Sequence, residues 1–204
     1  MLTLLAETRQ RQVFHVPGGA PAVFYLADAE AGGVLVNSPV FVPGLLTALV
    51  AVAPVRYVFY PSALGARDVA RWRAAGAKTL ASREELPAIP GLVDIPLERE
   101  HRFSRTISFL PMSGRTRGSC ALFCRNKPGL LFLGPILARG ERGWPTLIPG
   151  AGDYSWENRL CGVLGLQDVH FEYAYTDDFD PGASKTGPGA DKEIQWELQN
   201  ILGF

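Results

Sequence analysis

The sequence has no excess of charge and few cysteines. Its 204 residues include 20 Lys+Arg and 20 Asp+Glu, so the formal net charge is zero. A chain without a basic surplus gives no electrostatic reason to expect a nucleic acid or an anionic membrane surface as its partner. Three cysteines, an odd number in a chain long enough to build a core, favour reduced thiols and a cytoplasmic protein over a disulfide framework. We expect these cysteines to be buried and structural: Cys120, Cys124 and Cys161.

Long hydrophobic runs are also missing. The longest apolar stretch, from Val34 to Val55, is interrupted by Asn37, Ser38 and three prolines. It therefore does not supply the roughly 20 apolar residues that a spanning helix needs. The amino-terminal segment has a short apolar part and lacks the basic start of a secretory signal. We predict neither a membrane span nor export.

Histidine is scarce, and each histidine is isolated. The chain has three of them, His15, His101 and His170. None lies two or four residues from another, the spacings that place two ligands on one face of a strand or a helix. A single histidine in such a position is more often a surface or core residue than a metal ligand. The sequence therefore predicts no histidine-based metal site.

What the chain does have is a composition suited to one folded domain. Hydrophobic residues make up 47% of the sequence and charged residues 20%, which is enough apolar material for one well-filled core. We predict that residues 1–182 form this domain. Residues 183–204 add a Gly/Pro-rich loop and an amphipathic helix packed on the same domain. The apolar face of this helix is predicted to contain Ile194, Leu198, Ile201 and Leu202.

Strand and helix signals alternate in the first half of the chain. Short β-rich pieces separated by Gly/Pro turns in residues 13–37 predict an antiparallel meander. An apolar helix over 42–54, with Pro43 near its first position, leads to a strand over 55–60. A second helix over 64–75, with Val69 and Trp72 on one face, leads to another strand. We predict two successive βαβ units.

The second half begins with further antiparallel strands between residues 105 and 134. A helix over 154–164, with Asp153 as its cap, and a strand over 169–175 follow. Because antiparallel runs occur in both halves, a simple doubly wound sheet is excluded. The order of elements predicts an α/β fold, a four-layer αββα sandwich with helices outside two sheets.

Five segments, in order, resemble the metallo-β-lactamase superfamily over about residues 13 to 180. AGGVLVNSP is similar to the family's GGxLVD strand, and VRYVFYPSALGARDVARW to the strand, metal loop and helix that carry HxHxDH. FLPMSGRTRGSCALF resembles the PGHTPGS segment, LLFLGPILAR resembles LLFTGDxL, and FEYAYTDDFD resembles the closing strand. The resemblance implies the αββα fold, which in that family carries zinc- or iron-dependent hydrolases.

The sequence departs from the family pattern at the metal ligands. Pro61, Ser62 and Ala63 occupy the histidine loop, Arg115 replaces a histidine, and Pro135 stands where the metal-bridging Asp is expected. Proline and alanine side chains have no lone pair to give, and arginine carries a charge that repels a cation. A catalytic zinc needs about three His, Cys, Asp or Glu ligands. The resemblance therefore implies the fold without its metal, and we predict no cofactor.

Three carboxylates are left near the family's ligand positions, Asp68, Asp177 and Asp178. They could hold a hard ion such as Mg²⁺ through waters. Aspartates near turns are more often caps or solvated groups, and we favour that interpretation. Arg115 would either pair with Asp177 or Asp178 in place of the ion or bind an anionic ligand, and we favour the internal pair.

We expect a catalytically silent protein that binds a small ligand or a protein partner, a second copy included. The alternative is a hydrolase of an ester, thioester or phosphoester with a displaced or carboxylate-only metal site. A third possibility is an interaction module that docks through its carboxy-terminal apolar face, although packing of that face within the chain is preferred. The candidate pocket residues are Asn37, Tyr60, Ser62, Asp68, Ser113, Arg115, Asp177 and Asp178.

Overall fold

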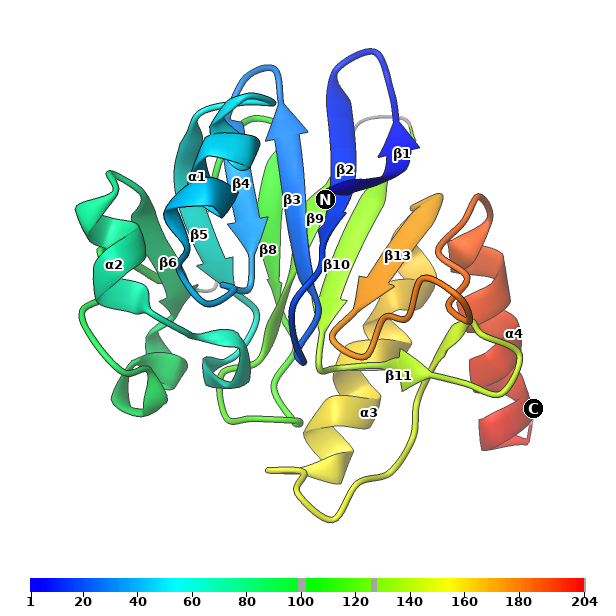
Figure 1. Ribbon diagram of the computed structural model, residues 1–204. Helices are drawn as coiled ribbons and strands as arrows, with labels where there is room; N and C mark the ends of the chain where they lie inside the picture. Colours follow the sequence, from blue (N-terminus) through cyan, green and yellow to red (C-terminus); the bar gives the residue numbers. More distant parts are fainter. Residues whose placement is uncertain (99–101, 126–127, 204) are drawn as a thin grey trace. The chain divides into compact units, whose positions relative to one another are not determined.

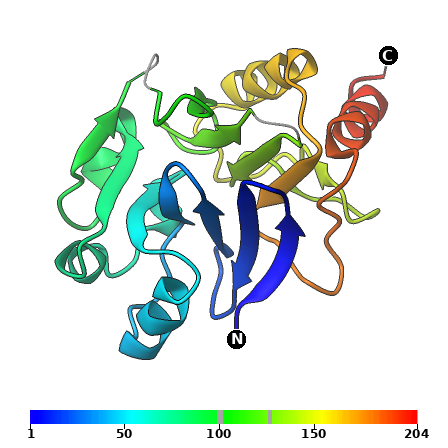
Figure 2. The same ribbon diagram turned by 90° about the horizontal axis from the view of Figure 1, so that it is seen from above.

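The structure is a computed structural model that describes residues 1–98, 102–125 and 128–203, without the side chain of Leu202. The chain divides into two compact units, Met1–Glu98 and Arg99–Phe204, which are described separately (Figures 1 and 2). The division falls inside the predicted domain of residues 1–182, so that domain stays a prediction. His101 lies outside the described residues.

The first unit contains a seven-stranded sheet whose strands follow chain order. Strands β1 to β4 pair antiparallel and strands β4 to β7 pair parallel, which confirms the predicted meander and the two βαβ units. Val58, Phe59 and Tyr60 are all buried, and such a continuous apolar run is typical of a parallel strand. The sequence analysis did not predict β1 or β7. The strands are β1 (Thr3–Glu7), β2 (Arg11–Val16), β3 (Val23–Asp28), β4 (Gly32–Val36), β5 (Val55–Tyr60), β6 (Lys78–Ser82) and β7 (Ile95–Leu97).

Two α-helices cover one face of this sheet (Figure 1). Pro43 begins the first helix, where its missing N–H costs nothing. Leu49 from this helix and Trp72 from the second pack in one cluster with Leu35 and Val58 of the sheet. Val69 is buried beside Trp72, as predicted. The helical elements are α1 (Pro43–Val50), η1 (Ala63–Gly65), α2 (Val69–Ala74) and η2 (Arg83–Ala88).

The second unit contains a four-stranded sheet in the order β13-β10-β9-β8. Strand β13 pairs parallel to β10, and the other pairs are antiparallel. Helices α3 and α4 supply Val163, Ile194 and Leu198 to one apolar cluster that also contains Leu131 and Ala174 of the sheet. The elements are β8 (Ile107–Pro111), β9 (Cys120–Cys124), β10 (Leu130–Gly134), β11 (Ala138–Arg139), β12 (Pro145–Thr146), α3 (Trp156–Leu164), η3 (Gly165–Asp168), β13 (Tyr173–Thr176) and α4 (Ala190–Leu202).

Several local predictions in this unit are wrong. The cap of α3 is Ser155, whose side chain accepts a hydrogen bond from the Asn158 N–H, so Asp153 is not the cap. The strand predicted over 169–175 is shorter and begins at residue 173, because the preceding backbone lies outside the ladder. On α4, Ile201 is 44% exposed and does not share the buried face of Ile194 and Leu198.

Two cysteine predictions are confirmed and one is wrong. Cys120 and Cys124 are free thiols buried in β9, whereas Cys161 is a free thiol exposed on α3. The helix places Cys161 away from the face that carries Val163, which explains its exposure. None of the helices in the part of the chain that the structure describes has the length and apolar character to cross a bilayer.

Candidate functional site

The carboxyl ends of the parallel strands β4 and β5 bring together the predicted residues of the first unit. Asn37 follows β4, and its N–H donates to the Phe59 carbonyl at 2.9 Å, which places it beside the end of β5 at Tyr60. Asn37 has a left-handed backbone with φ of 63°, which asparagine tolerates better than most residues. Its side-chain amide donates to the Ala22 carbonyl at 2.8 Å. The Asn37 side chain therefore ties this strand end to the start of β3.

The loop after β5, which resembles the histidine loop of metallo-β-lactamases, is held by hydrogen bonds from its own unit. The buried carboxylate of Glu85 accepts from the Ala63 N–H at 2.6 Å. The Ser38 hydroxyl accepts from the Arg67 N–H at 2.8 Å and donates to the Arg67 carbonyl at 2.6 Å. A Cβ added to Gly65 would lie 1.8 Å from the Asn37 Oδ1 atom. The loop thus lies directly on Asn37, and protein atoms fill this space.

Tyr60 and Ser62 are both 0% exposed at this strand end. Burial raises the pKa of Tyr60 to about 12, and its hydrogen bond with Ser38 offsets only part of that rise. The phenol is therefore neutral near pH 7. The Ser62 hydroxyl has no hydrogen-bond partner among the residues that the structure describes. A serine without an adjacent base is not an activated nucleophile.

Asp68 uses its carboxylate to organise the chain before α2. Its Oδ2 atom accepts a hydrogen bond from the Phe41 N–H at 2.8 Å. The residue occupies the position before α2 with φ of 46°, but its side chain makes no capping hydrogen bond to that helix. The expected helix cap is therefore wrong for Asp68, and its carboxylate instead links the segment before α1 to the start of α2.

In the second unit, Arg115 forms its ion pair with Asp153. Arg115 Nη1 lies 3.0 Å from Asp153 Oδ1. Asp178 instead accepts from the Thr176 hydroxyl and the Arg139 N–H, both at 2.7 Å. The predicted pairing of Arg115 with Asp177 or Asp178 is therefore wrong, although an internal pair exists.

The packing of the β8–β9 loop explains this choice of partner. The Ser155 N–H donates to the Gly114 carbonyl at 3.0 Å, and the Tyr154 N–H donates to the Arg115 carbonyl at 3.3 Å. A Cβ on Gly114 would lie 2.3 Å from the Arg159 backbone nitrogen, so the loop lies against the first turn of α3. Asp153 immediately precedes that turn and is the carboxylate that Arg115 meets.

Arg159 is a second cation in this cluster. Its Nη1 atom lies 2.8 Å from Asp153 Oδ2, and its side chain is 3% exposed. The guanidinium also donates to the carbonyls of Ile136 at 2.7 Å and Ile148 at 2.9 Å. A buried arginine is stable only when its charge and its N–H groups are satisfied in this way.

The charges of this cluster do not cancel. Burial raises the pKa of Asp153, but hydrogen bonds from Arg159, the Gly150 N–H and Arg115 lower it by more, so the carboxyl group is ionised at neutral pH. One carboxylate between two guanidinium groups leaves one positive charge. The Arg115 side chain is 32% exposed, and a guanidinium has five N–H donors. Chemically, the cluster is suited to holding an anion.

Other hydrogen bonds position the remaining predicted residues of this unit. The Asp177 N–H donates to the Gly134 carbonyl at 2.9 Å, which positions the residues after β13 beside the end of β10. Asp178 is exposed, and Ser113 is half-buried in the β8–β9 loop. Four of the eight candidates, Asn37, Tyr60, Ser62 and Asp68, thus belong to the first unit and four to the second.

The sequence analysis missed Arg159, Glu85 and the role of Asp153. Arg159 could have been noticed, because it lies three residues after Trp156 and four before Val163, a spacing that places it on the same helix face as these two apolar residues. A charged residue in an apolar stripe usually requires a buried partner. Nothing in the spacing of Glu85 indicates that its carboxylate binds the Ala63 N–H.

The residues present do not fit a catalytic metal of the metallo-β-lactamase type. Within residues 1–98, 102–125 and 128–203, no group of three His, Cys, Asp or Glu side chains is arranged to hold an ion. The carboxylates of Asp68 and Asp178 already accept backbone N–H donors. His15 lies in β2 with its pKa lowered by burial, and His170 is exposed beside Asp191.

Comparison with solved structures identifies the fold. A metallo-β-lactamase from Pontibacter korlensis superimposes with a TM-score of 0.70 at 14% identity, over 100% of this chain and 98% of that one. A HARLDQ motif mutant of the metallo-β-lactamase from Cronobacter sakazakii gives a TM-score of 0.69 at 13% identity, over 98% of this chain and 96% of that one. The subclass B3 metallo-β-lactamase of Bradyrhizobium japonicum gives a TM-score of 0.63 at 14% identity, over 97% of this chain and 93% of that one.

Sequence comparison gives no such match. No protein-family model matches the chain, and no curated protein is similar enough to count as a relative. The structural likeness at 13 to 14% identity establishes the architecture and confirms the predicted fold class. The chain has the metallo-β-lactamase fold.

Proposed function

We propose that this chain is a metallo-β-lactamase-fold protein without metal-dependent catalysis, and that it binds a small anionic ligand at Arg115. The observation that carries the proposal is the donor set. Proline, serine, alanine and arginine stand at the ligand positions that the resemblance aligns, and no cluster of three metal-binding side chains occurs in the described parts of the chain. Without such a cluster a divalent ion has no site in which to activate water.

The anion-binding role rests on the charge of the Arg115 cluster. The charge of Arg159 depends on Asp153, because the Arg159 side chain is only 3% exposed. Arg115 is the more exposed of the two cations, so part of its guanidinium is available to a ligand. Arginine binds carboxylate and phosphate oxygens through paired N–H donors. Phosphate is the simplest anion with that geometry.

Titration with inorganic phosphate tests this role. Isothermal titration of the protein should show saturable binding, and Arg115→Gln should weaken it by about tenfold, equivalent to about 1.4 kcal/mol. The matched control is Arg139→Gln, which changes an arginine of the same unit with a similar exposure, 34%, and its own ion pair. Equal weakening by both substitutions, or no binding to the unmodified protein, contradicts the proposal.

Metal analysis separates the proposal from the hydrolase alternative. After dialysis against metal-free buffer, the purified protein should retain far less than one equivalent of zinc, iron or manganese. Stoichiometric metal together with chelator-sensitive hydrolysis of an ester, thioester or phosphoester would establish the alternative. A cytoplasmic location, a protein partner or second copy, and the lack of a nucleic-acid partner are part of the proposal and need separate tests.

A further inference from the structure

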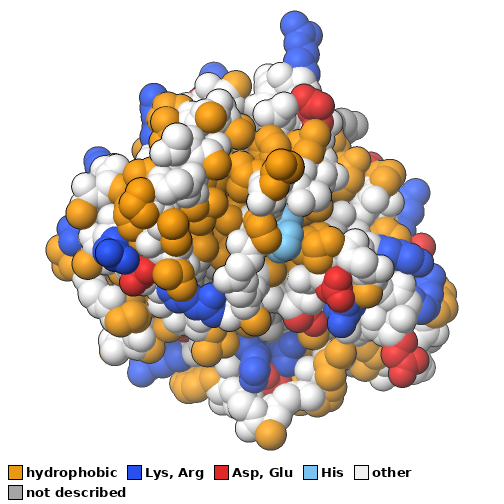
Figure 3. Space-filling view, viewed as in Figure 1, with side chains coloured by type: hydrophobic (Ala, Val, Ile, Leu, Met, Phe, Trp, Pro, Cys, Tyr) orange, Lys and Arg blue, Asp and Glu red, His pale blue; other side chains and the backbone are white. Residues whose placement is uncertain are grey.

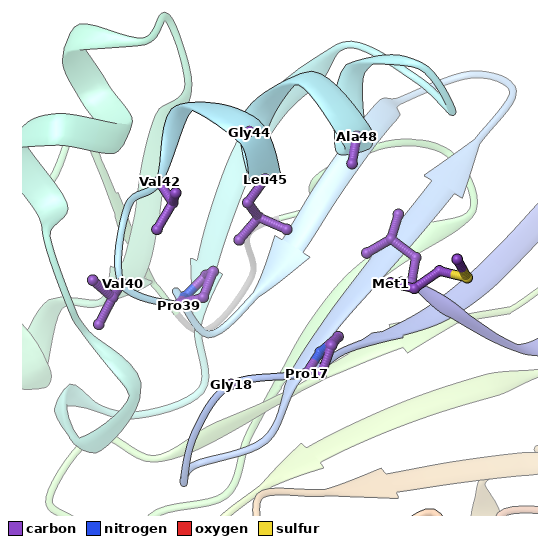
Figure 4. Close-up of a pocket in the computed structure, with 10 residues that line it drawn as sticks. Met1, Pro17, Gly18, Pro39, Val40, Val42, Gly44, Leu45 and Ala48 are labelled. Atoms are coloured by element: carbon purple, nitrogen blue, oxygen red, sulfur yellow. The ribbon is translucent and has the colours of Figure 1, made fainter.

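A groove in the first unit lies between α1 and the residues around the ends of β1 and β2. Its volume is about 430 Å³, within the range of roughly 300 to 1,000 Å³ that is typical of small-molecule sites. Leu45 and Ala48 of α1 face Met1 and Pro17 across it (Figure 4). The lining residues are Met1, Leu2, Pro17, Gly18, Pro39, Val40, Val42, Gly44, Leu45 and Ala48.

The groove and the helix beside it carry no charged side chain. The sequence has no Asp, Glu, Lys or Arg between Glu30 and Arg56. Val40 is 55% exposed and Val42 51% exposed, at the end of the groove where α1 begins. Hydrophobic side chains gather over this part of the surface (Figure 3). Apart from the α-ammonium group of Met1, the lining is therefore without charge, and a concave surface made of such side chains favours an apolar occupant.

Two arginines, which are not among the lining residues, bind backbone carbonyls next to the end of the groove that contains Gly18 and Val40. Arg67 donates through Nη2 to the Ala20 carbonyl, next to the Gly18–Gly19 turn. Arg71 donates to the Phe41 carbonyl at 3.5 Å, and its Cζ lies 5.6 Å from the centre of the Phe41 ring.

These arginines leave a positive charge at that end of the groove. The nearest acidic group that contacts the same segment is Asp68, which accepts the Phe41 N–H. Two guanidinium groups and one carboxylate give a net charge of about +1.

We propose that this groove binds a free single-chain amphiphile, a fatty-acid carboxylate, with its apolar tail along α1 and its anionic head beside Arg67 and Arg71. The lining residues Gly18, Gly44 and Ala48 have little or no side chain, which leaves a channel for a thin tail. The apolar side chains of the lining supply affinity in proportion to the tail that they bury. The two arginines supply the complementary charge at one end.

A chain-length series tests the apolar part. Octanoate, decanoate and dodecanoate are titrated calorimetrically into the full chain below their micelle concentrations. Each added CH₂ should tighten binding about fourfold, the equivalent of about 0.8 kcal/mol, until the groove is full. Octan-1-ol should bind about tenfold more weakly than octanoate because it lacks the charge. Affinity that is independent of chain length, or equal for the alcohol and the acid, overturns the proposal.

Two pairs of variants place the ligand. Ala48→Trp fills the groove from α1 and should weaken dodecanoate binding at least tenfold, whereas Val50→Trp puts the same ring on the same helix outside the lining and should leave binding unchanged. The double variant Arg67→Gln with Arg71→Gln should weaken binding about tenfold, whereas Arg9→Gln should not. Melting temperatures verify that each variant is folded. Equal effects within either pair overturn the proposal.

Two other occupants are outcomes of the same test. Vesicles of phosphatidylcholine and phosphatidylglycerol offer the protein an anionic bilayer. If the protein binds these vesicles but does not bind monomeric dodecanoate, the proposal is overturned in favour of a membrane surface. Size-exclusion chromatography at increasing concentration detects a second copy. If the protein forms a dimer that Ala48→Trp dissociates, and dodecanoate has no effect on that dimer, the proposal is overturned in favour of self-association.

Discussion

Asp153→Asn is expected to destabilise the protein strongly, because this carboxylate neutralises a buried arginine. The Asp153 side chain is 6% exposed and lies 2.8 Å from Arg159, whose side chain is 3% exposed. The amide of asparagine keeps the shape of the group but carries no charge. Arg159 would then hold its charge in the interior without a carboxylate, and its acceptors would be the asparagine amide oxygen and the carbonyls of Ile136 and Ile148, all of them neutral. That is the situation in which a broken buried ion pair costs the most.

The magnitude follows from the burial of the two arginines. Loss of one member of a buried pair costs about 3 to 5 kcal/mol. Because Arg159 keeps its two carbonyl acceptors, we expect the lower end, about 3 kcal/mol, for the loss of that pair. The contribution of Arg115, whose side chain is 32% exposed, is below about 1 kcal/mol because water screens the pair. Arg115→Gln should therefore be a mild variant.

Urea unfolding followed by circular dichroism measures these effects. With a slope of about 3 kcal/mol per molar urea, Asp153→Asn should lower the midpoint by about 1 M. The control is Asp168→Asn, which removes one negative charge from an exposed position of the same unit and should change stability by less than about 0.5 kcal/mol. Equal midpoints for the two variants would refute the reasoning.

The pH dependence provides a second check. The pKa of Asp153 is lowered in the folded protein, so its stabilising effect is fully present above the pKa of an unfolded aspartate, about 3.9. That effect is lost as the pH falls through the folded pKa, because the carboxyl group then takes up a proton. The stability difference between the unmodified protein and Asp153→Asn should shrink below about pH 4. If the stability difference between the two proteins grows as the pH falls, the predicted direction of this pH dependence is wrong.

Three further predictions concern other buried groups. Asp28→Ala removes the 2.6 Å pair with buried Arg11 and should cost about 3 kcal/mol in urea unfolding, and a loss below 1 kcal/mol would show that the pair contributes little. Burial raises the pKa of Tyr60 to about 12, so on a rise in pH the unfolded chain loses the phenol proton before the folded protein does. The free energy of unfolding should therefore fall between about pH 10 and 12. The fall should be smaller in Tyr60→Phe. Equal losses in both proteins would exclude Tyr60 as the source. Leu198→Ala should cost about 2 to 5 kcal/mol, whereas Ile201→Ala on the same helix should cost less than about 1 kcal/mol, and thermal unfolding that ranks them in the opposite order would contradict the observed packing.

The main elements could be predicted because their signals are local. Alternating apolar residues and Gly/Pro turns marked the meander, and the apolar run before Val55 marked the first βαβ unit. Elements such as β7, with three residues, and β11, with two, are too short to show a period. The start of β13 was predicted four residues too early. Phe171 is buried as a strand residue would be, although it lies before the first residue of the strand.

The candidate site was predicted only in part. Asn37, Tyr60 and Ser62 lie at the ends of adjacent parallel strands, where a sheet topology deduced from sequence places them, whereas Asp68 lies before α2. The partner of Arg115 could not be deduced in this way. It depends on how the β8–β9 loop lies against α3, which brings together two residues that are 38 positions apart in the chain.

The sequence by itself determined the types of the main elements and the chemistry available at each position, because periodicity and side-chain identity are properties of neighbouring residues. Its resemblance to metallo-β-lactamases implied that proline, alanine and arginine stand at the positions of that family's metal ligands. Only the tertiary structure decided which charges meet, that Asp153 binds both Arg115 and Arg159, and that α1 borders a groove lined by apolar side chains. These features depend on contacts between distant segments, which packing selects and which no local pattern encodes.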